Sequence, residues 1–161
     1  MKKYGIGLSF IALICTLLVS CQSAEGRMSD KEYYFCHNGH TITVGDDADG
    51  LVESIGEANR VSRTTSCAGE GEDELYIYSG FRLFAHRDME KCTVVAIELT
   101  NDAVSTPEGI RIGDKVERVK ERYGEAKEKN GFLEYESKGC RLRFYLREGR
   151  VSGIKYLKND G

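Results

Sequence analysis

The sequence predicts an α+β fold in which two tandem repeats, each a helix followed by an antiparallel meander of strands, form one compact domain. Three observations support this prediction. A segment with the pattern of a short helix occurs twice in the chain. After each copy the spacing of apolar residues changes from a period of about 3.6 to one of about 2, which is the change from helix to strand. About 130 residues follow the N-terminal leader, which is the usual size of a single domain.

The repeated segment aligns with its second copy without a gap. Residues 42–58 read I-T-V-G-D-D-A-D-G-L-V-E-S-I-G-E-A, and residues 110–126 read I-R-I-G-D-K-V-E-R-V-K-E-R-Y-G-E-A. Gly45 corresponds to Gly113, so the second copy lies 68 residues after the first. A constant period of this kind indicates a duplicated structural unit.

Residues 1–20 have the pattern of a secretory signal peptide. Two lysines precede an uncharged apolar run at residues 6–19, and this run is too short to predict a membrane span. The tetrapeptide L-V-S-C that ends at Cys21 resembles the lipobox of bacterial lipoproteins. The resemblance implies that the chain is cleaved before Cys21, that the Cys21 sulfur carries a diacylglyceryl group, and that the new amino group can accept a further acyl chain such as palmitate.

Several acyl chains together hold a protein on a membrane far more firmly than one chain does. We therefore expect the protein to be lipid-anchored to the outer face of the bacterial cell membrane. Residues 21–30 are small and polar, as in a flexible tether. The first module is expected at residues 31–104 and the second at residues 105–161, and the linker at residues 101–109 contains the single proline, Pro107.

The first module begins with two β-prone runs around Asn38-Gly39, which predict a hairpin. A short helix follows, with apolar residues on one face at Ala48, Leu51, Val52 and Ile55. Either Asp46 or Asp47 is the expected N-cap, and Gly56 is the expected end of the helix. Strands are expected at residues 60–66, 75–79, 81–86 and 93–99.

The second module is expected to follow the same template. Asp114 is its predicted helix cap and Gly124 its predicted helix end. The residues expected to face inward are Val116, Val119 and Tyr123. Strands are expected at residues 126–129, 132–136, 140–146 and 150–157.

A helix covers only one face of such a sheet and leaves the other face to water or to a partner. Near the end of the chain, apolar residues alternate with polar or aromatic ones from Cys140 to Arg147, which is typical of a two-faced strand. Aromatic and arginine side chains dominate the energetics of interfaces. We therefore predict a partner surface formed by Arg82, Phe84, Arg141, Arg143 and Tyr145.

The paired helix segments, each followed by a meander, resemble the tandem modules of the β-lactamase-inhibitor-protein-like fold, which small lipoproteins of outer-membrane assembly share. A group of uncharacterised lipoproteins from low-GC Gram-positive bacteria is similar in S-C-A at 66–68, S-G-F at 79–81 and S-T-P-E-G-I-R-I-G-D at 105–114. The resemblance implies the fold and no particular activity. The chain departs from the group after Ala68, where an aromatic commonly follows, and in its extra cysteines at positions 36, 92 and 140.

Four cysteines remain after the leader and the lipidated Cys21 are set aside: Cys36, Cys67, Cys92 and Cys140. Disulfides persist in exported domains, and four cysteines allow three pairings. A disulfide between Cys67 and Cys92 is our first choice, because the meander places both at the same end of the first sheet. Cys36 and Cys140 would then pair or stay free.

Two other patterns invite a ligand interpretation. Cys36, His37 and His40, with distant His86, lack the spacing of zinc ligands, and neighbours on a strand point to opposite faces. The acidic run at residues 46–50 lacks the alternate acids and the final glutamate of a calcium loop. Its second copy keeps the aspartate alone, as helix capping requires.

The sequence contains no Gly-x-Ser-x-Gly elbow and no phosphate-binding loop after a strand. The carboxylate run Glu70, Glu72, Asp73 and Glu74 is interpreted as a solvated loop. We therefore predict no catalytic residues, no metal and no small-molecule cofactor. With 23 Lys+Arg against 26 Asp+Glu and a net charge of −3, no nucleic-acid partner is expected either.

These observations predict a lipoprotein that binds or scaffolds a protein or cell-envelope partner and is not an enzyme. The alternatives are a cell-envelope enzyme, an inhibitor of a secreted or envelope hydrolase, and a factor in envelope assembly. An inhibitor would form a stoichiometric complex with the hydrolase and abolish its turnover. A scaffold would cross-link to envelope proteins and leave hydrolase rates unchanged.

Overall fold

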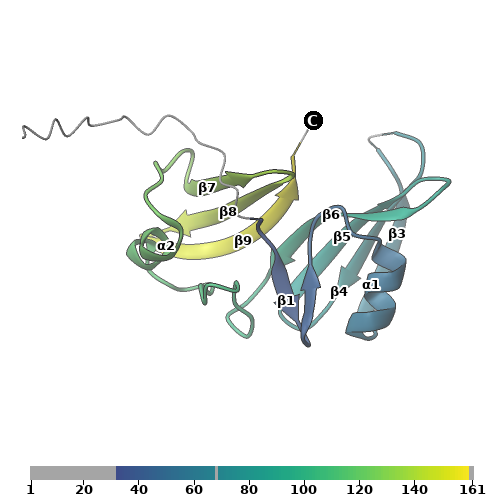
Figure 1. The fold of residues 1–161 in the computed structure, drawn as a ribbon, viewed down its shortest axis with the longest axis horizontal. Helices are drawn as coiled ribbons and strands as arrows, with labels where there is room; N and C mark the ends of the chain where they lie inside the picture. The colour runs from purple at the N-terminus through teal and green to yellow at the C-terminus, as the bar shows by residue number, and fades with distance from the viewer. Residues whose placement is uncertain (1–31, 68, 160–161) are drawn as a thin grey trace, which may run out of the picture.

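The structure is a computed structural model that describes residues 32–67 and 69–159. The predicted signal peptide, the lipidated Cys21 and the tether lie outside the described residues. The described chain contains two helices and a large antiparallel sheet, which confirms the α+β class (Figure 1). None of its helices is long and apolar enough to cross a membrane.

Seven antiparallel strands form the main sheet, in the order β3-β4-β5-β6-β9-β8-β7. Their bounds are β3 Arg60–Thr65, β4 Glu72–Ile77, β5 Phe81–Arg87, β6 Cys92–Leu99, β9 Arg150–Lys158, β8 Cys140–Arg147 and β7 Phe132–Ser137. At the centre β6 pairs with β9, from Ala96 opposite Leu157 to Leu99 opposite Ile154. This pair makes one continuous sheet from strands that are far apart in the sequence (Figure 1).

One face of the sheet, here called the inner face, packs against both helices and a separate hairpin. Because side chains alternate between the faces of a strand, every second residue is buried there in most of the strands, whereas the edge strand β3 has no buried residue. The inner-face core includes Phe81, Leu83, Ile97, Leu99, Leu133, Leu142, Phe144, Ile154 and Tyr156, all fully or almost fully buried. The opposite face is called the outer face.

The separate hairpin is formed by β1 (Phe35–His37) and β2 (His40–Ile42), as predicted. Its turn residues Asn38 and Gly39 have φ of 49° and 81°, and positive φ at both positions is the requirement of the tightest hairpin turn. Phe35 is fully buried and contacts inner-face aromatic rings, with a ring-centroid distance of 5.0 Å to Phe81.

The first helix, α1, spans Ala48–Ile55, as predicted. Asp47 is its N-cap, since its carboxylate accepts a hydrogen bond from the Gly50 amide at 3.2 Å. Asp46, the other candidate cap, instead accepts a hydrogen bond from the Thr43 amide at 2.7 Å and closes the turn before the helix. Ala48 and Ile55 are buried at the two ends of the apolar stripe.

The second helix, α2, spans Val116–Tyr123, but its cap differs from the prediction. Lys115 is the N-cap residue and makes no capping bond with its side chain. Asp114 lies one residue before the cap position and corresponds to Asp46 of the first copy, which also does not cap its helix. The Asp114 carboxylate accepts hydrogen bonds from the Arg111 amide at 2.8 Å and the Arg118 guanidinium at 2.9 Å.

Two strand predictions also need correction. The expected strand at 126–129 does not form, because Asn130 and Gly131 turn the chain so that only Lys129 bridges to Phe132. β4 begins at Glu72 rather than at Leu75, since Glu72 pairs with both Thr65 and Arg87. The sheet therefore has four strands from the first half of the chain and three from the second.

The turn between β3 and β4 requires glycine at position 71. Gly71 has φ of 116°, and a Cβ atom there would lie 2.2 Å from the Arg87 carbonyl oxygen. We expect Gly71→Ala to lower the free energy of unfolding by roughly 3 kcal/mol through backbone strain and steric overlap. Urea denaturation measures this change. Gly69→Ala is the matched control, since its Cβ would meet no atom within 4 Å, and an equal loss in both variants would contradict this account.

Candidate functional site

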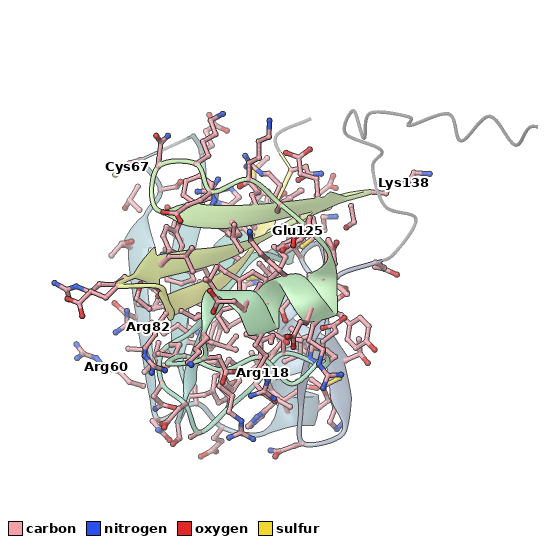
Figure 2. The ribbon with its side chains drawn as sticks, turned by 90° about the vertical axis from the view of Figure 1, so that its left-hand side faces the viewer. Arg60, Cys67, Arg82, Arg118, Glu125 and Lys138 are labelled. Carbon is pink, nitrogen blue, oxygen red and sulfur yellow. The ribbon has the colours of Figure 1, made fainter. Side chains whose placement is uncertain are left out.

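All five residues predicted to form a partner surface lie on the outer face. Arg82 and Phe84 alternate along β5 with buried inner-face residues, and Arg141, Arg143 and Tyr145 do the same along β8. Arg82 is exposed and the other four are partly exposed. Figure 2 shows Arg82 projecting from the left-hand side of the molecule, opposite the hairpin. The structure therefore brings the predicted residues, which come from both halves of the chain, onto one surface.

A row of charged side chains crosses the middle of this face, with one residue from each of five neighbouring strands. Arg82 stands opposite Glu98 and Glu98 opposite Lys155, with nitrogen–oxygen distances of 3.4 Å and 3.1 Å. Lys155 stands opposite Arg143, and Arg143 forms an ion pair with Glu134 at 2.5 Å. The side chains of this row are partly exposed, between 20% and 47%. Ion pairs between such side chains contribute little stability, so their main effect is to hold the charges in fixed positions.

Arg143 is the most constrained member of the row. Its guanidinium carbon lies 4.2 Å from the centroid of the Phe132 ring, a cation–π contact. It also lies 5.9 Å from the ring of Tyr145, whose hydroxyl accepts a hydrogen bond from Arg143 at 3.4 Å. A side chain held in this way would lose little further entropy in any contact that it made.

An apolar strip runs beside the charged row. Phe84 stands opposite Leu75 on one side and Ala96 on the other, and Ala96 stands opposite Leu157. These side chains are partly exposed rather than buried. An apolar centre bordered by arginine and tyrosine has the composition of a protein interface.

Phe84 and Tyr145 each border a β-bulge. The ladder shifts between Phe84 and Ala85 in β5, and between Tyr145 and Leu146 in β8. A bulge bends its strand and changes the direction of nearby side chains. Tyr145 also packs over Gly153 of β9, where an added Cβ would lie 3.6 Å from the tyrosine ring.

The sequence did not reveal several members of this surface, among them Glu98, Lys155, Glu134 and Phe132. Alternation along β7 places Phe132 and Glu134 on one face, and this signal was available from the sequence. Their proximity to Arg143 depends on the strand order, which no local pattern contains.

The expected disulfide between Cys67 and Cys92 is not formed, and the four cysteines of the described chain are free thiols. Register explains why. Thr65 pairs with Glu72, Glu72 with Arg87 and Arg87 with Cys92, so the start of β6 lies three strands away from β3. At about 4.8 Å per strand this separation is about twice the Cα distance that a disulfide spans.

The buried thiols are poor nucleophiles. Burial raises the pKa of Cys92 and of Cys140 to about 11, so both stay protonated at neutral pH. Within the described residues, no three His, Cys, Asp or Glu side chains are grouped as metal ligands would be. His37, from the metal pattern that we rejected, packs 4.7 Å from the Phe81 ring centroid, and its burial lowers its pKa.

A second cluster surrounds Glu74 on the inner face. The residues expected to form a solvated acidic loop are instead partly in β4, and Glu74 is only 2% exposed. It accepts hydrogen bonds from Tyr76 and, at 2.5 Å, from Arg87. Arg87 also binds both carboxylate oxygens of Asp49 in α1, at 2.6 Å and 3.0 Å. The cluster therefore fastens α1 to the sheet.

The charges of this cluster are set by its hydrogen bonds. Burial alone would raise the pKa of Glu74, but hydrogen bonds from Arg87 and Tyr76 outweigh burial and lower it below 4.5. Burial and the hydrogen bond to Glu74 raise the pKa of Tyr76 to about 12. The carboxylate is thus ionised and paired at neutral pH, which suits a structural role.

Comparison of the chain with protein-family models, with curated proteins and with solved structures finds no significant match. The geometry of the described residues therefore carries the functional argument.

The lowered pKa of Glu74 makes stability depend on pH. Its contribution is complete above the ordinary glutamate pKa of 4.5 and is lost as the pH falls through the lower folded-state value. We expect Glu74→Gln to lower the free energy of unfolding by about 2 kcal/mol near pH 7, because Arg87 loses one partner of a buried pair. The difference from the unmodified protein should shrink toward about pH 3.

Denaturant titrations at the two pH values test this expectation. Glu72→Gln is the matched control, since Glu72 is exposed on the same strand and should change stability by less than about 0.5 kcal/mol. A difference between Glu74→Gln and the unmodified protein that does not depend on pH would contradict the assigned role.

Proposed function

We propose that this protein is a membrane-anchored extracytoplasmic lipoprotein whose outer sheet face binds a protein partner of the cell envelope, without catalysing a reaction. The observation that carries the proposal is the outer face itself. There a partly exposed apolar strip around Phe84 adjoins Arg143, which is already held by Glu134, Phe132 and Tyr145. Pre-organised arginine and aromatic side chains beside an apolar strip suit the binding of a folded surface.

The charges on the face suit a partner with a modest negative potential. The row contains three basic and two acidic side chains: Arg82, Lys155 and Arg143 against Glu98 and Glu134. Exposed charges of this kind guide a partner into register and influence association rate more than final affinity. The apolar strip, which extends over four strands, supplies the hydrophobic contribution to binding.

We further propose that the chain consists of two tandem modules, residues 31–104 and 105–161, of the β-lactamase-inhibitor-protein-like kind. The sequence repeat supports this proposal, and so do matching turn contacts. Asp46 accepts from the amide three residues before it at 2.7 Å, and Asp114 does so at 2.8 Å. Gly45 donates to Val94 at 2.7 Å and Gly113 to Val151 at 2.8 Å.

In each module a tyrosine hydroxyl donates to the glycine that ends the helix. Tyr78 donates to the Gly56 carbonyl at 3.3 Å, and Tyr135 donates to the Gly124 carbonyl at 2.8 Å. Joining such modules through their last strands produces one seven-stranded face from a four-stranded and a three-stranded sheet, which is wider than either module offers. This width gives the proposed duplication a functional consequence.

The binding face is tested by Phe84→Ala combined with Tyr145→Ala. We expect recovery of the envelope partner, by cross-linking and affinity capture on the full chain, to fall at least about tenfold, since anchor residues of an interface commonly contribute 2 kcal/mol or more. Met89→Ala is the matched control, because Met89 is 97% exposed in the turn after β5. Unchanged recovery by a double variant that still unfolds cooperatively would remove this face from consideration.

The anchor is tested by Cys21→Ser. The lipobox resemblance predicts that this substitution abolishes incorporation of a labelled lipid precursor and releases the protein from the membrane fraction. Cys36→Ser, which replaces an exposed thiol of the described chain, should change neither. Continued lipid incorporation by Cys21→Ser would overturn the proposed anchor.

A further inference from the structure

The edge of the sheet at β3 is open. Among the described residues β3 has one neighbour, β4, and forms one end of the seven-stranded order. The β3–β4 ladder pairs all six residues from Arg60 to Thr65 without a bulge. The strand also lacks proline and lysine, which are common protections of an edge against pairing with another chain.

The ladder determines which backbone groups face outward. Ser66 donates its amide to the Gly71 carbonyl at 3.0 Å, and hydrogen-bonded pairs alternate along an antiparallel ladder. Ser62 and Thr64 therefore bond to β4, whereas Val61, Arg63 and Thr65 direct their N–H and C=O groups away from it. An added strand would find three donors and three acceptors at the spacing of a β-ladder.

The other edge of the sheet, at β7, differs in two respects. The backbone N–H and C=O of Phe132 are already hydrogen-bonded to Lys129 at 3.2 Å and 2.9 Å. Its outer-face side chains include the acids Glu134 and Glu136. The β7 edge is thus partly closed by its own chain and is acidic, whereas the β3 edge is open and basic.

The side chains of β3 indicate what would pair with it. Arg60 is exposed on the outer face (Figure 2) and pairs with no described carboxylate. Arg63 lies on the inner-face side, where its side chain is 57% exposed and its Nε lies 3.4 Å from Glu74 Oε1. Val61, on the same side as Arg63, is 40% exposed, one of the two most exposed large apolar residues described.

We propose that β3 accepts an extended acidic segment of a partner protein, which adds an eighth antiparallel strand to the sheet. Such a segment would place acids three residues apart, opposite Arg63 and Arg60, and an apolar residue opposite Val61. A second copy of this chain fits poorly. The antiparallel register that uses all three outward residues sets Arg63 opposite Arg63 of the other copy, and like charges directly opposite are destabilising.

This inference concerns the strand edge and goes beyond the proposed binding face. Phe84 and Tyr145 are not on β3, so the double variant described above leaves the edge intact. If the double variant loses the envelope partner but still binds a peptide at β3, the edge is not the contact with that partner. If the chain captures the envelope partner but binds no peptide at β3, the proposal for the edge fails and the proposed binding face is unaffected.

The probe is the peptide Ac-TVETVE-NH2, which has the required alternation, added to the isotope-labelled full chain in detergent. We expect it to slow amide hydrogen exchange at Val61, Arg63 and Thr65 several-fold and to leave the β7 edge unchanged. The basic peptide Ac-TVKTVK-NH2 should bind about tenfold more weakly, because two favourable cross-strand charge pairs become unfavourable.

Two variants separate charge from backbone pairing. Arg60→Glu should reduce the preference for the acidic peptide, and its matched control Arg147→Glu, an exposed arginine in β8, should not. Val61→Pro removes one outward N–H and spares the bonds to β4, so it should weaken binding of both peptides while the amides of Ser62 and Thr64 stay protected.

The proposal is overturned by equal affinity for the acidic and basic peptides, or by Val61→Pro binding as well as the unmodified chain. It is also overturned if Val61, Arg63 and Thr65 are already protected in the free chain. Protection in a dimer would identify a second copy as the occupant, and protection in a monomer would identify the chain's own N-terminal segment.

Discussion

The pairing of β6 with β9 is the contact on which the other features depend. Without it the strands would form a four-stranded and a three-stranded sheet, each ending in a long strand with unpaired backbone groups. Joined over Ala96–Leu99 and Ile154–Leu157, they bury Ile97 and Ile154 at the centre of one inner face. The same join carries the outer charged row across the molecule, since Glu98 binds both Arg82 and Lys155.

The two faces of this sheet have different energetic roles. The inner face holds the core, the hairpin and both helices, and its buried carboxylate, Glu74, is compensated by Arg87 and Tyr76. The outer face holds partly exposed ion pairs, which contribute little stability, together with aromatic contacts. Side chains that the core does not bury are the ones available for binding. The proposed partner surface therefore lies on the outer face.

Local patterns in the sequence predicted much of the fold. Helical spacing located α1 and α2, and Asn38-Gly39 located the hairpin. The errors have separate causes. Asp114, like Asp46 in the first copy, closes the turn before the helix instead of capping it. Asn130-Gly131 turns the chain where a strand was expected. Glu72 pairs with Arg87, so β4 begins early and Glu74 becomes buried.

By itself the sequence determined which side chains share a face. The pleat gives every strand a period of two, so Arg82 and Phe84 had to point one way along β5, and Arg141, Arg143 and Tyr145 one way along β8. Tertiary structure decided which of them are neighbours. It placed Lys155 between Glu98 and Arg143, and it separated Cys67 from Cys92 by three strands. Strand order and register result from packing between residues far apart in the chain, and a period in the sequence carries no information about that packing.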